Sequence, residues 1–297
     1  MSSLAKSTNF PVELAREMFS KVTGHSSIAR LSNQSPISFS GNEIMTFSLD
    51  KEISIVAEGG AKPAGDATVG TVTIQPIKVV YQSRVNDEFM KCAEEKQLSY
   101  LQAFADGYAK KIARGLDIMV FHGLNPADSS TSSLIGTNCF DRNTAVNVTA
   151  YTAPEASITA AIAALSTTAS EYDCNGIAMS KIFAANLAAT TYAGGQHPYE
   201  EFMWAGNPGS IRGIACDVNS SVSVSASTAK VHYAYLGDFQ NAFKWGYAEN
   251  IPLEVIEYGN PDGGTYDLKQ ANQVLLRAEA YIGWGILDGA AFSRIGD

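Results

Sequence analysis

QLSYLQAFADGYAKKIARGLDIMVF, residues Gln97 to Phe121, is the stretch around which the rest of this chain can be arranged. Its apolar residues recur in steps of three and four, the spacing of one face of an α-helix: Leu101, Phe104, Ala105, Tyr108, Ile112, Leu116 and Met119. The opposite face carries Asp106, Lys110 and Arg114, as expected of a side that faces solvent or a partner. A helix of about 25 residues is roughly 37 Å long, more than twice the usual length, so it needs a sheet to lie on.

Composition favours a two-lobed protein that associates with itself. At 297 residues the chain is close to the size at which single cores stop growing. Charged residues make up only 17%, so neutral residues or other copies of the chain must cover much of the surface. The formal charge is −9 and lysine and arginine do not cluster, which excludes a protein that grips nucleic acid through its phosphates.

Cysteine spacing and hydropathy indicate a reduced, intracellular protein outside the membrane. The cysteines form no CxxC pair, and the start does not resemble a signal peptide; they are Cys92, Cys139, Cys174 and Cys216. No apolar run approaches the roughly 18 residues that span a bilayer.

Two stretches of alternating apolar residues predict a long antiparallel hairpin. They are Ile44 to Ala57 and Gly70 to Val85. Between them, Glu58 to Thr68 contains three glycines and a proline, so we expect a mobile tip. A two-stranded ribbon is marginal in water, and we therefore expect this hairpin to lie on a neighbouring subunit.

The remaining segments predict an arm, an α/β lobe and a closing sheet. Pro11 to Val22 predicts a short helix, His25 to Phe39 an extended arm rather than a packed element, and Glu88 to Glu95 another short helix. The α/β lobe follows from a helix at Pro154 to Leu165, a strand at Gly176 to Met179 and a helix capped by Ser180. For the sheet we expect Ala242 to Tyr247 paired with Ile251 to Tyr258, and Gln273 to Leu287 beneath the long helix.

The sequence contains no pattern of catalytic or ligand-binding residues. GxSxG, HExxH and acidic calcium loops are absent, and GGAKPAG lacks phosphate-loop spacing and precedes a strand. We assign the separated histidines to surface or helix-end positions rather than to a ligand set: His25, His122, His197 and His232. We expect the tryptophans Trp204, Trp245 and Trp284 to pack in the core and at interfaces. The sequence therefore predicts no enzyme, no cofactor and no metal.

The order of these parts resembles the major capsid proteins of tailed bacteriophages, whose fold is named after bacteriophage Hong Kong 97. The resemblance runs from about Leu4 to Ile295, and the order and spacing of its segments carry it. Those segments are VAEGGAKP with TVTIQPIKVVYQSRVNDEFM, LDIMVFHGLNP with LIGTNCF, IAMSKIFAANLAAT with GNPGSIRGIACDV, and LGDFQNAFKWG with QVLLRAEAYIGWGILDGAAF.

The resemblance implies an α+β capsid fold with an arm, an extended hairpin loop, a peripheral domain and an axial α/β domain. Its parts are an N-terminal arm at 1–43, an extended loop hairpin at 44–85, a peripheral domain with a spine helix at 86–125, an axial domain at 126–235, a peripheral sheet and loop at 236–286, and a return to the axial domain at 287–297.

Three sets of site residues follow from the same resemblance. Inter-subunit contacts of the loop tip fall on Glu58, Gly59, Gly60, Lys62, Pro63 and Asp66. A loop near the three-fold positions comprises Asn260, Pro261, Asp262 and Gly263. Some relatives join a loop lysine to an asparagine beside a catalytic glutamate; the candidates here are Lys62, Asn272 and Glu279, although the glutamate-bearing motif is not in clean register.

The implied function is a virion shell of pentamers and hexamers around a genome, assembled in the host cytoplasm. The implied partners are other copies of the chain, a scaffolding protein, a portal, and double-stranded DNA enclosed without sequence-specific binding. Some relatives carry an amino-terminal scaffolding segment that a protease removes. An arm that begins near Met1 implies a separate scaffolding protein or a chain without that segment. The alternatives are an encapsulin-like nanocompartment around a cargo protein, and a hydrolase, for which no nucleophile–base set is present.

Overall fold

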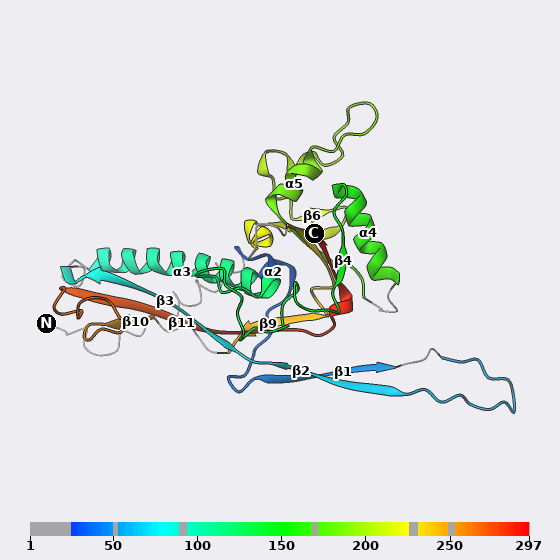
Figure 1. Ribbon diagram of the computed structural model, residues 1–297, viewed down its shortest axis with the longest axis horizontal. Coiled ribbons are helices and arrows are strands. Elements are labelled where there is room, and N and C mark those ends of the chain that lie inside the picture. Colours follow the sequence, from blue (N-terminus) through cyan, green and yellow to red (C-terminus); the bar gives the residue numbers. More distant parts are fainter. Residues whose placement is uncertain are drawn as a thin grey trace.

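The protein has two packed lobes and a hairpin that projects from them (Figure 1). The computed structural model describes residues 25–49, 53–88, 94–167, 172–225, 231–248 and 253–296. The predicted helix at Pro11 to Val22 lies outside these residues, and the one at Glu88 to Glu95 lies mostly outside them. In the described part of the chain, no helix combines the length and apolarity needed to cross a membrane.

The long helix α3 runs from Glu94 to His122, three residues earlier and one later than predicted. The predicted apolar stripe is buried at Ala105, Tyr108, Ile112, Leu116 and Met119. The last turns of α3 are buried on all sides, because this end of the helix packs between the two lobes (Figure 1).

The sheet under α3 is built around one long strand. Strand β11, Gln273–Ile286, pairs antiparallel with β3, β9 and β10. Their bounds are Ile77–Asn86, Phe243–Tyr247 and Leu253–Ile256. The predicted pairing of the last two strands with each other is therefore wrong: each pairs with β11, whose 14 residues offer partners for both.

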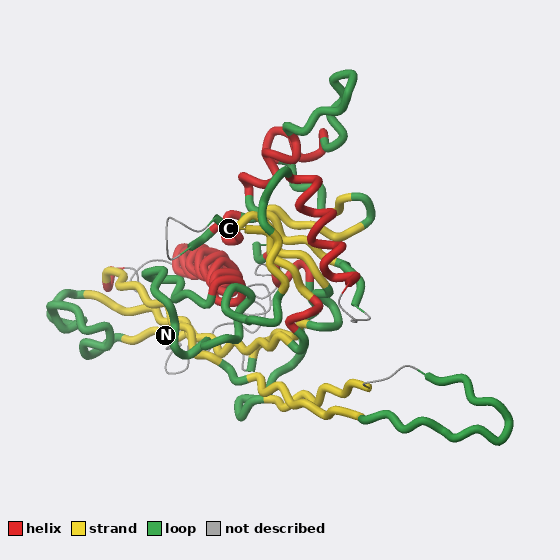
Figure 2. The backbone as a smooth tube through the Cα atoms, turned by 45° about the vertical axis from the view of Figure 1, so that its right-hand side comes forward, coloured by secondary structure: helices red, strands yellow, loops and turns green. Residues whose placement is uncertain are grey.

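The hairpin consists of β1, Asn42–Leu49, and β2, Ala67–Ile74, which pair antiparallel. Our single predicted strand at Gly70 to Val85 is wrong, because the chain leaves the hairpin at Gln75-Pro76 and β3 then joins the sheet under α3. Pro76 lacks the N–H that would continue the ladder. Only the first five residues of that segment, Gly70 to Ile74, therefore belong to the projecting hairpin (Figure 2).

Residues 25–37 form a packed element, which corrects the predicted extended arm. Ser27–Leu31 is a short helix, α2, capped by Ser26, and Ile28 is fully buried. The following residues run against β9, where a Cβ on Gly246 would come within 1.8 Å of the Ser35 carbonyl oxygen. Only glycine permits that approach, so the backbone of this segment lies directly against the sheet.

The second lobe is the predicted α/β unit, with a mixed sheet in the order β4-β12-β8-β5-β7-β6. The strands are Asn147–Thr149, Phe292–Gly296, His232–Gly237, Gly176–Met179, Ile214–Val218 and Ser210–Ile211. Helices α4, Pro154–Thr167, and α5, Lys181–Ala188, are confirmed, and the Ser180 hydroxyl accepts from the Phe183 N–H as the predicted cap. Short 3₁₀ turns complete the lobe at Glu200–Ala205, Ser220–Ser223 and Gly289–Ala291.

Both faces of this second sheet are buried, and this joins the lobes. The protein has two hydrophobic cores, one on each face of this sheet. Along β5, Ile177 and Met179 pack in the core that contains α5, while Ala178 packs in the core that contains α3. Along β8, Tyr235 faces the α3 side and its neighbour Leu236 faces the other. Alternation along β8 thus brings Tyr235 to the end of α3. His232, three residues earlier, would face the other side by alternation alone, but the register of β8 against β12 shifts between Ala234 and His232.

Candidate functional site

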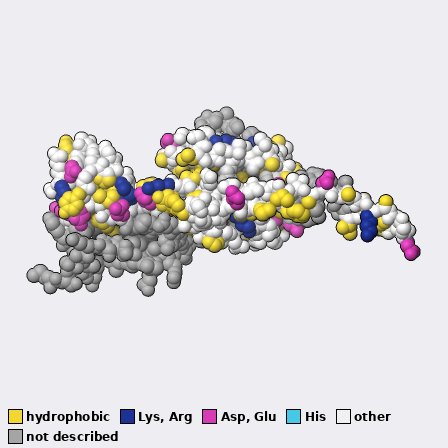
Figure 3. Space-filling view, turned by 90° about the horizontal axis from the view of Figure 1, so that it is seen from below, with side chains coloured by type: hydrophobic (Ala, Val, Ile, Leu, Met, Phe, Trp, Pro, Cys, Tyr) yellow, Lys and Arg dark blue, Asp and Glu magenta, His cyan; other side chains and the backbone are white. Residues whose placement is uncertain are grey.

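The projecting hairpin exposes large apolar side chains. Met45 is 73% exposed, Phe47 65% and Val69 55%, and Ile53 and Ile55 beyond the paired strands are fully exposed. Seen from below, hydrophobic side chains lie along the hairpin that extends at the right (Figure 3). Contiguous apolar exposure on a soluble protein marks an interaction surface, because this area stays in contact with water until a partner covers it.

The predicted tip residues lie together on the exposed end of this hairpin. All residues from Glu58 to Asp66 are exposed. The turn is closed by the Gly60 N–H, which donates to the Ala57 carbonyl at 2.9 Å, and Gly59 adopts a φ of +78° that favours glycine. The tip is therefore available for contacts with another molecule.

The predicted loop at Asn260 to Gly263 is held by Arg84, which the sequence did not reveal. The Arg84 guanidinium donates to the two carboxylate oxygens of Asp262 at 2.5 and 2.7 Å and to the Asn260 side-chain oxygen at 2.8 Å. The hydrogen bond from Arg84 lowers the pKa of Asp262 to about 2. Arg84 lies on β3, 178 residues before Asp262, so no local pattern could have linked them.

The three cross-link candidates do not meet within one chain. Lys62 is on the hairpin tip, and Asn272 lies immediately before β11 with a φ of +50°. The Glu279 carboxylate on β11 forms an ion pair with Lys78 of β3 at 2.8 Å. A link from Lys62 of one subunit to Asn272 of another stays a prediction.

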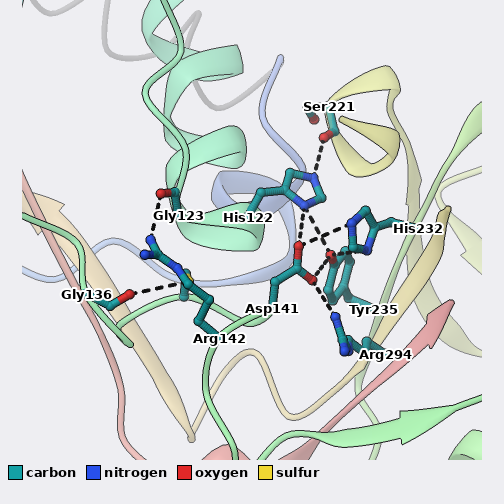
Figure 4. Close-up of polar contacts among 10 residues, drawn as sticks. His122, Gly123, Gly136, Asp141, Arg142, Ser221, His232, Tyr235 and Arg294 are labelled. Carbon is teal, nitrogen blue, oxygen red and sulfur yellow. Dashed lines mark hydrogen bonds and ion pairs between the residues drawn. The ribbon is translucent and has the colours of Figure 1, made fainter. Parts of the chain in front are cut away.

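A buried polar cluster lies where the end of α3 meets the second sheet (Figure 4). Asp141 is its centre. Its Oδ2 lies 2.8 Å from Nδ1 of His122 and 3.4 Å from Nε2 of His232, and its Oδ1 accepts from the Tyr235 hydroxyl at 2.7 Å and from Arg294 at 3.2 Å. These residues come from α3, the following loop, β8 and β12.

The electrostatics of this cluster favour an ionised Asp141. Burial raises the pKa of Asp141, but the hydrogen bond and charge of His122, the charge of His232 and the Tyr235 hydroxyl outweigh it, and the pKa lies below its usual value. Burial, with the nearby Asp141 charge, raises the pKa of Tyr235. This hydroxyl therefore stays protonated and donates a hydrogen bond to Asp141. Both histidines are buried. His122 is a helix-end residue, as predicted, because it is the last residue of α3, but His232 lies in β8 of the second sheet, so our assignment is wrong for His232.

A second buried carboxylate holds α2 to α3. Asp117 accepts from the hydroxyls of Ser26 and Ser221, both at 2.6 Å, and from the backbone N–H groups of Ser27 at 3.1 Å and Ile28 at 3.2 Å. Burial raises the pKa of Asp117 to about 6, although these hydrogen bonds act in the opposite direction. The function of Asp117 is therefore to attach the segment after residue 25 to the body.

Comparisons with known proteins identify the family. A model of the phage capsid family matches residues 10–296. A chain from a solved structure of Mycobacterium phage Ogopogo is 31% identical, with 92% of each chain covered and a TM-score of 0.76. One from Gordonia phage Cozz is 21% identical, over 98% of this chain and 87% of that chain, with a TM-score of 0.71.

A more distant likeness, to the capsid of a native GTA particle, shows the same fold at 14% identity. It covers 91% of this chain and 89% of that chain, with a TM-score of 0.61. No curated protein matches the chain. The family match spans almost the whole sequence, from before α2 to the end of β12. This two-lobed protein with its exposed apolar hairpin thus belongs to the phage capsid family.

Proposed function

We propose that this major capsid protein is a Hong Kong 97-type subunit whose hairpin lies across the adjacent subunit of a pentamer or hexamer. The observation that carries the proposal is the exposure of Met45, Phe47, Ile53, Ile55 and Val69 on a ribbon that extends from the body. Each fully buried side chain of this kind contributes about 1.5–3 kcal/mol. Repeated over a shell, such modest contacts give a stable lattice, since linked contacts act at high effective concentration.

Two further exposed regions fit the same arrangement. The loop at Asn260 to Gly263, which Arg84 holds in one conformation, would meet its copies near the three-fold positions. On the second lobe, Trp204 is 99% exposed beside α5, where Ile182 is also exposed. These side chains support the assignment of the second lobe as the axial domain, which meets neighbouring copies around the five- or six-fold centre.

The other partners follow from the chemistry of the subunit. The net charge of −9 disfavours tight contact with phosphates, which suits a shell that encloses double-stranded DNA without sequence-specific binding. Retention of DNA by the isolated protein at physiological salt would contradict this. A scaffolding protein and a portal, with assembly in the host cytoplasm, complete the proposal, and nuclease-protected DNA in purified particles would distinguish it from an encapsulin-like shell around a protein cargo.

Removal of the hairpin end tests the central claim. We replace residues 50–66 with a two-residue Asn-Gly turn, which suits a tight hairpin. We expect far-UV circular dichroism and urea unfolding of the subunit to stay as in the wild type, while electron microscopy shows no shells.

The matched control keeps the length of the loop and changes only its chemistry. It replaces Ile53, Ile55 and Val56 with serine, and we expect weaker assembly with the same subunit stability. The proposal is wrong if the shortened chain still forms shells. It is also wrong if the shortened chain unfolds, because the hairpin would then be part of the subunit's own core.

A further inference from the structure

The hydrogen-bond partners of His122 determine which of its ring nitrogens carries a proton. Nε2 lies 3.0 Å from the backbone carbonyl oxygen of Ser221, which can only accept, so Nε2 is the donor. In the neutral ring Nδ1 then has a lone pair, and this atom lies 2.8 Å from Oδ2 of Asp141. Two lone pairs at that distance repel each other unless a positive charge lies between them.

The other contacts of the cluster orient His232 in the same way. The Tyr235 hydroxyl has one hydrogen, which it donates to Oδ1 of Asp141 at 2.7 Å. Its oxygen can accept from Nδ1 of His232 at 3.5 Å, and this places Nε2 of His232 toward Oδ2 of Asp141 at 3.4 Å. Two imidazole nitrogens and one carboxylate oxygen thus converge.

We propose that His122 Nδ1, Asp141 Oδ2 and His232 Nε2 bind a divalent transition-metal ion of the zinc class. One ligand atom from each residue lies within 4.8 Å of the others. Imidazole with carboxylate is a ligand set of zinc, whereas magnesium and calcium prefer oxygen alone.

The surroundings of these ligands match those of protein-bound metals. A metal-bound histidine typically donates a hydrogen bond from the N–H of its second ring nitrogen to a carbonyl group, as His122 does to Ser221. Donors to the free carboxylate oxygen are likewise typical, and here Tyr235 and Arg294 supply them. Because the Asp141 and Arg294 side chains are 12% and 17% exposed, water can reach the cluster as a fourth ligand.

The location of the site assigns its role. His122 is the last residue of α3, Asp141 lies in the loop after it, and His232 begins β8. An ion held by all three would fasten the helix of one lobe to the sheet of the other. The bound ion stabilises the folded subunit, since an unfolded chain cannot bring together ligands so far apart in sequence.

Metal titration of the full-length chain tests the proposal. After treatment with a chelator, isothermal titration calorimetry with Zn²⁺ should show one equivalent bound per chain, with a rise in Tm, and Mg²⁺ should produce neither. Co²⁺ should give the visible absorption of a tetrahedral nitrogen and oxygen site without a thiolate charge-transfer band.

Variants locate the binding. His232→Gln should lower the Zn²⁺ affinity at least tenfold while the far-UV spectrum stays as in the wild type, and His25→Gln, at an exposed histidine, should bind as the wild type does. If His122→Gln does not fold, His232→Gln decides alone. The proposal is overturned if the wild type does not bind stoichiometrically, if His232→Gln binds equally well, or if ¹⁵N spectra show both His122 nitrogens protonated in the presence of Zn²⁺. The last result would mean that a proton, and not a metal, supplies the charge.

Discussion

The hairpin β1–β2 and the ladder β3–β11 have the same antiparallel pairing, and β3 directly follows β2 in the chain, yet their surroundings are opposite. The first pairs eight residues on each strand and the second pairs ten. On β11 every second residue is buried beneath α3: Leu276, Ala278, Ala280 and Ile282. On the hairpin, Met45 and Phe47 remain largely exposed.

This difference shows that strand pairing and burial are decided separately. Alternating residues are enough to form a ladder, but the stability of the ladder comes from whatever covers its apolar face. For β3–β11 that cover is α3 of the same chain, whereas the hairpin depends on another subunit in our proposal. Substitutions in the β3–β11 ladder should therefore change the stability of the subunit, whereas substitutions in the hairpin should change the assembly of the shell.

The largest effect should follow Trp284→Ala in the buried end of β11, which continues beyond its pairing with β3 and pairs with β9. Trp284 is buried opposite Trp245, and its ring N–H donates to the Asn138 carbonyl at 2.8 Å. We expect a loss of about 3–5 kcal/mol in the free energy of unfolding, measured by urea unfolding of dissociated subunits. Trp204→Ala removes the same side chain from an exposed position and should change this free energy by less than about 0.5 kcal/mol. Equal losses in both variants would break the comparison.

The next effect concerns Asp117, on which the attachment of α2 depends. Its pKa is about 6 in the folded state, against an ordinary value of 3.8, so between these values the folded chain holds a proton that the unfolded chain has lost. This group's contribution to stability is therefore present at low pH and is lost as the pH rises through about 6. The expected decrease is on the order of 3 kcal/mol between pH 4 and pH 7.

Asp117→Asn removes this titration. Urea unfolding of both proteins across that pH range should show the wild-type advantage decreasing toward pH 7. A constant difference between the two curves would contradict the raised pKa.

A smaller, local effect should follow Arg84→Lys. Arg84 is on the covered ladder but reaches Asp262 and Asn260 of the exposed loop. Lysine keeps the charge but not the paired hydrogen bonds, so the loop should become more accessible while the sheet is unchanged. Limited proteolysis should cut faster within residues 259–267, with urea unfolding as in the wild type. Unchanged cleavage would show that the loop is held by contacts other than Arg84; Lys111→Arg, on the exposed face of α3, is the control.

The smallest effect on the subunit should follow Phe47→Ser in the hairpin. Because Phe47 is 65% exposed, its removal should change the free energy of unfolding by less than about 0.5 kcal/mol. Shell assembly, followed by light scattering and electron microscopy, should nevertheless require a higher protein concentration. Glu43→Gln, on the same strand, should assemble as the wild type does. A clear loss of subunit stability in Phe47→Ser would mean that the hairpin packs on its own body.

Local periodicity predicted much of this fold. The stripe from Leu101 to Met119 identified α3 within a few residues of its ends, and the Ser180 cap and Pro154 start located α5 and α4. The hairpin was predicted, but the predicted second strand ran beyond Pro76. Apolar residues continue to alternate after this proline, although they there belong to β3, which pairs with β11 in a different sheet. The predicted pairing of β9 with β10 was wrong for a similar reason, since each strand pairs with β11 later in the chain.

By itself the amino-acid sequence determined α3, α4 and α5, the apolar hairpin and the family resemblance, because these depend on the spacing of neighbouring residues. Only the tertiary structure decided what lies beside what: α2 on Asp117, Arg84 on the exposed loop, and His122 beside His232 around Asp141. Such contacts join residues tens to nearly two hundred positions apart. Chain folding creates them through burial and hydrogen-bond geometry, for which linear spacing carries no signal.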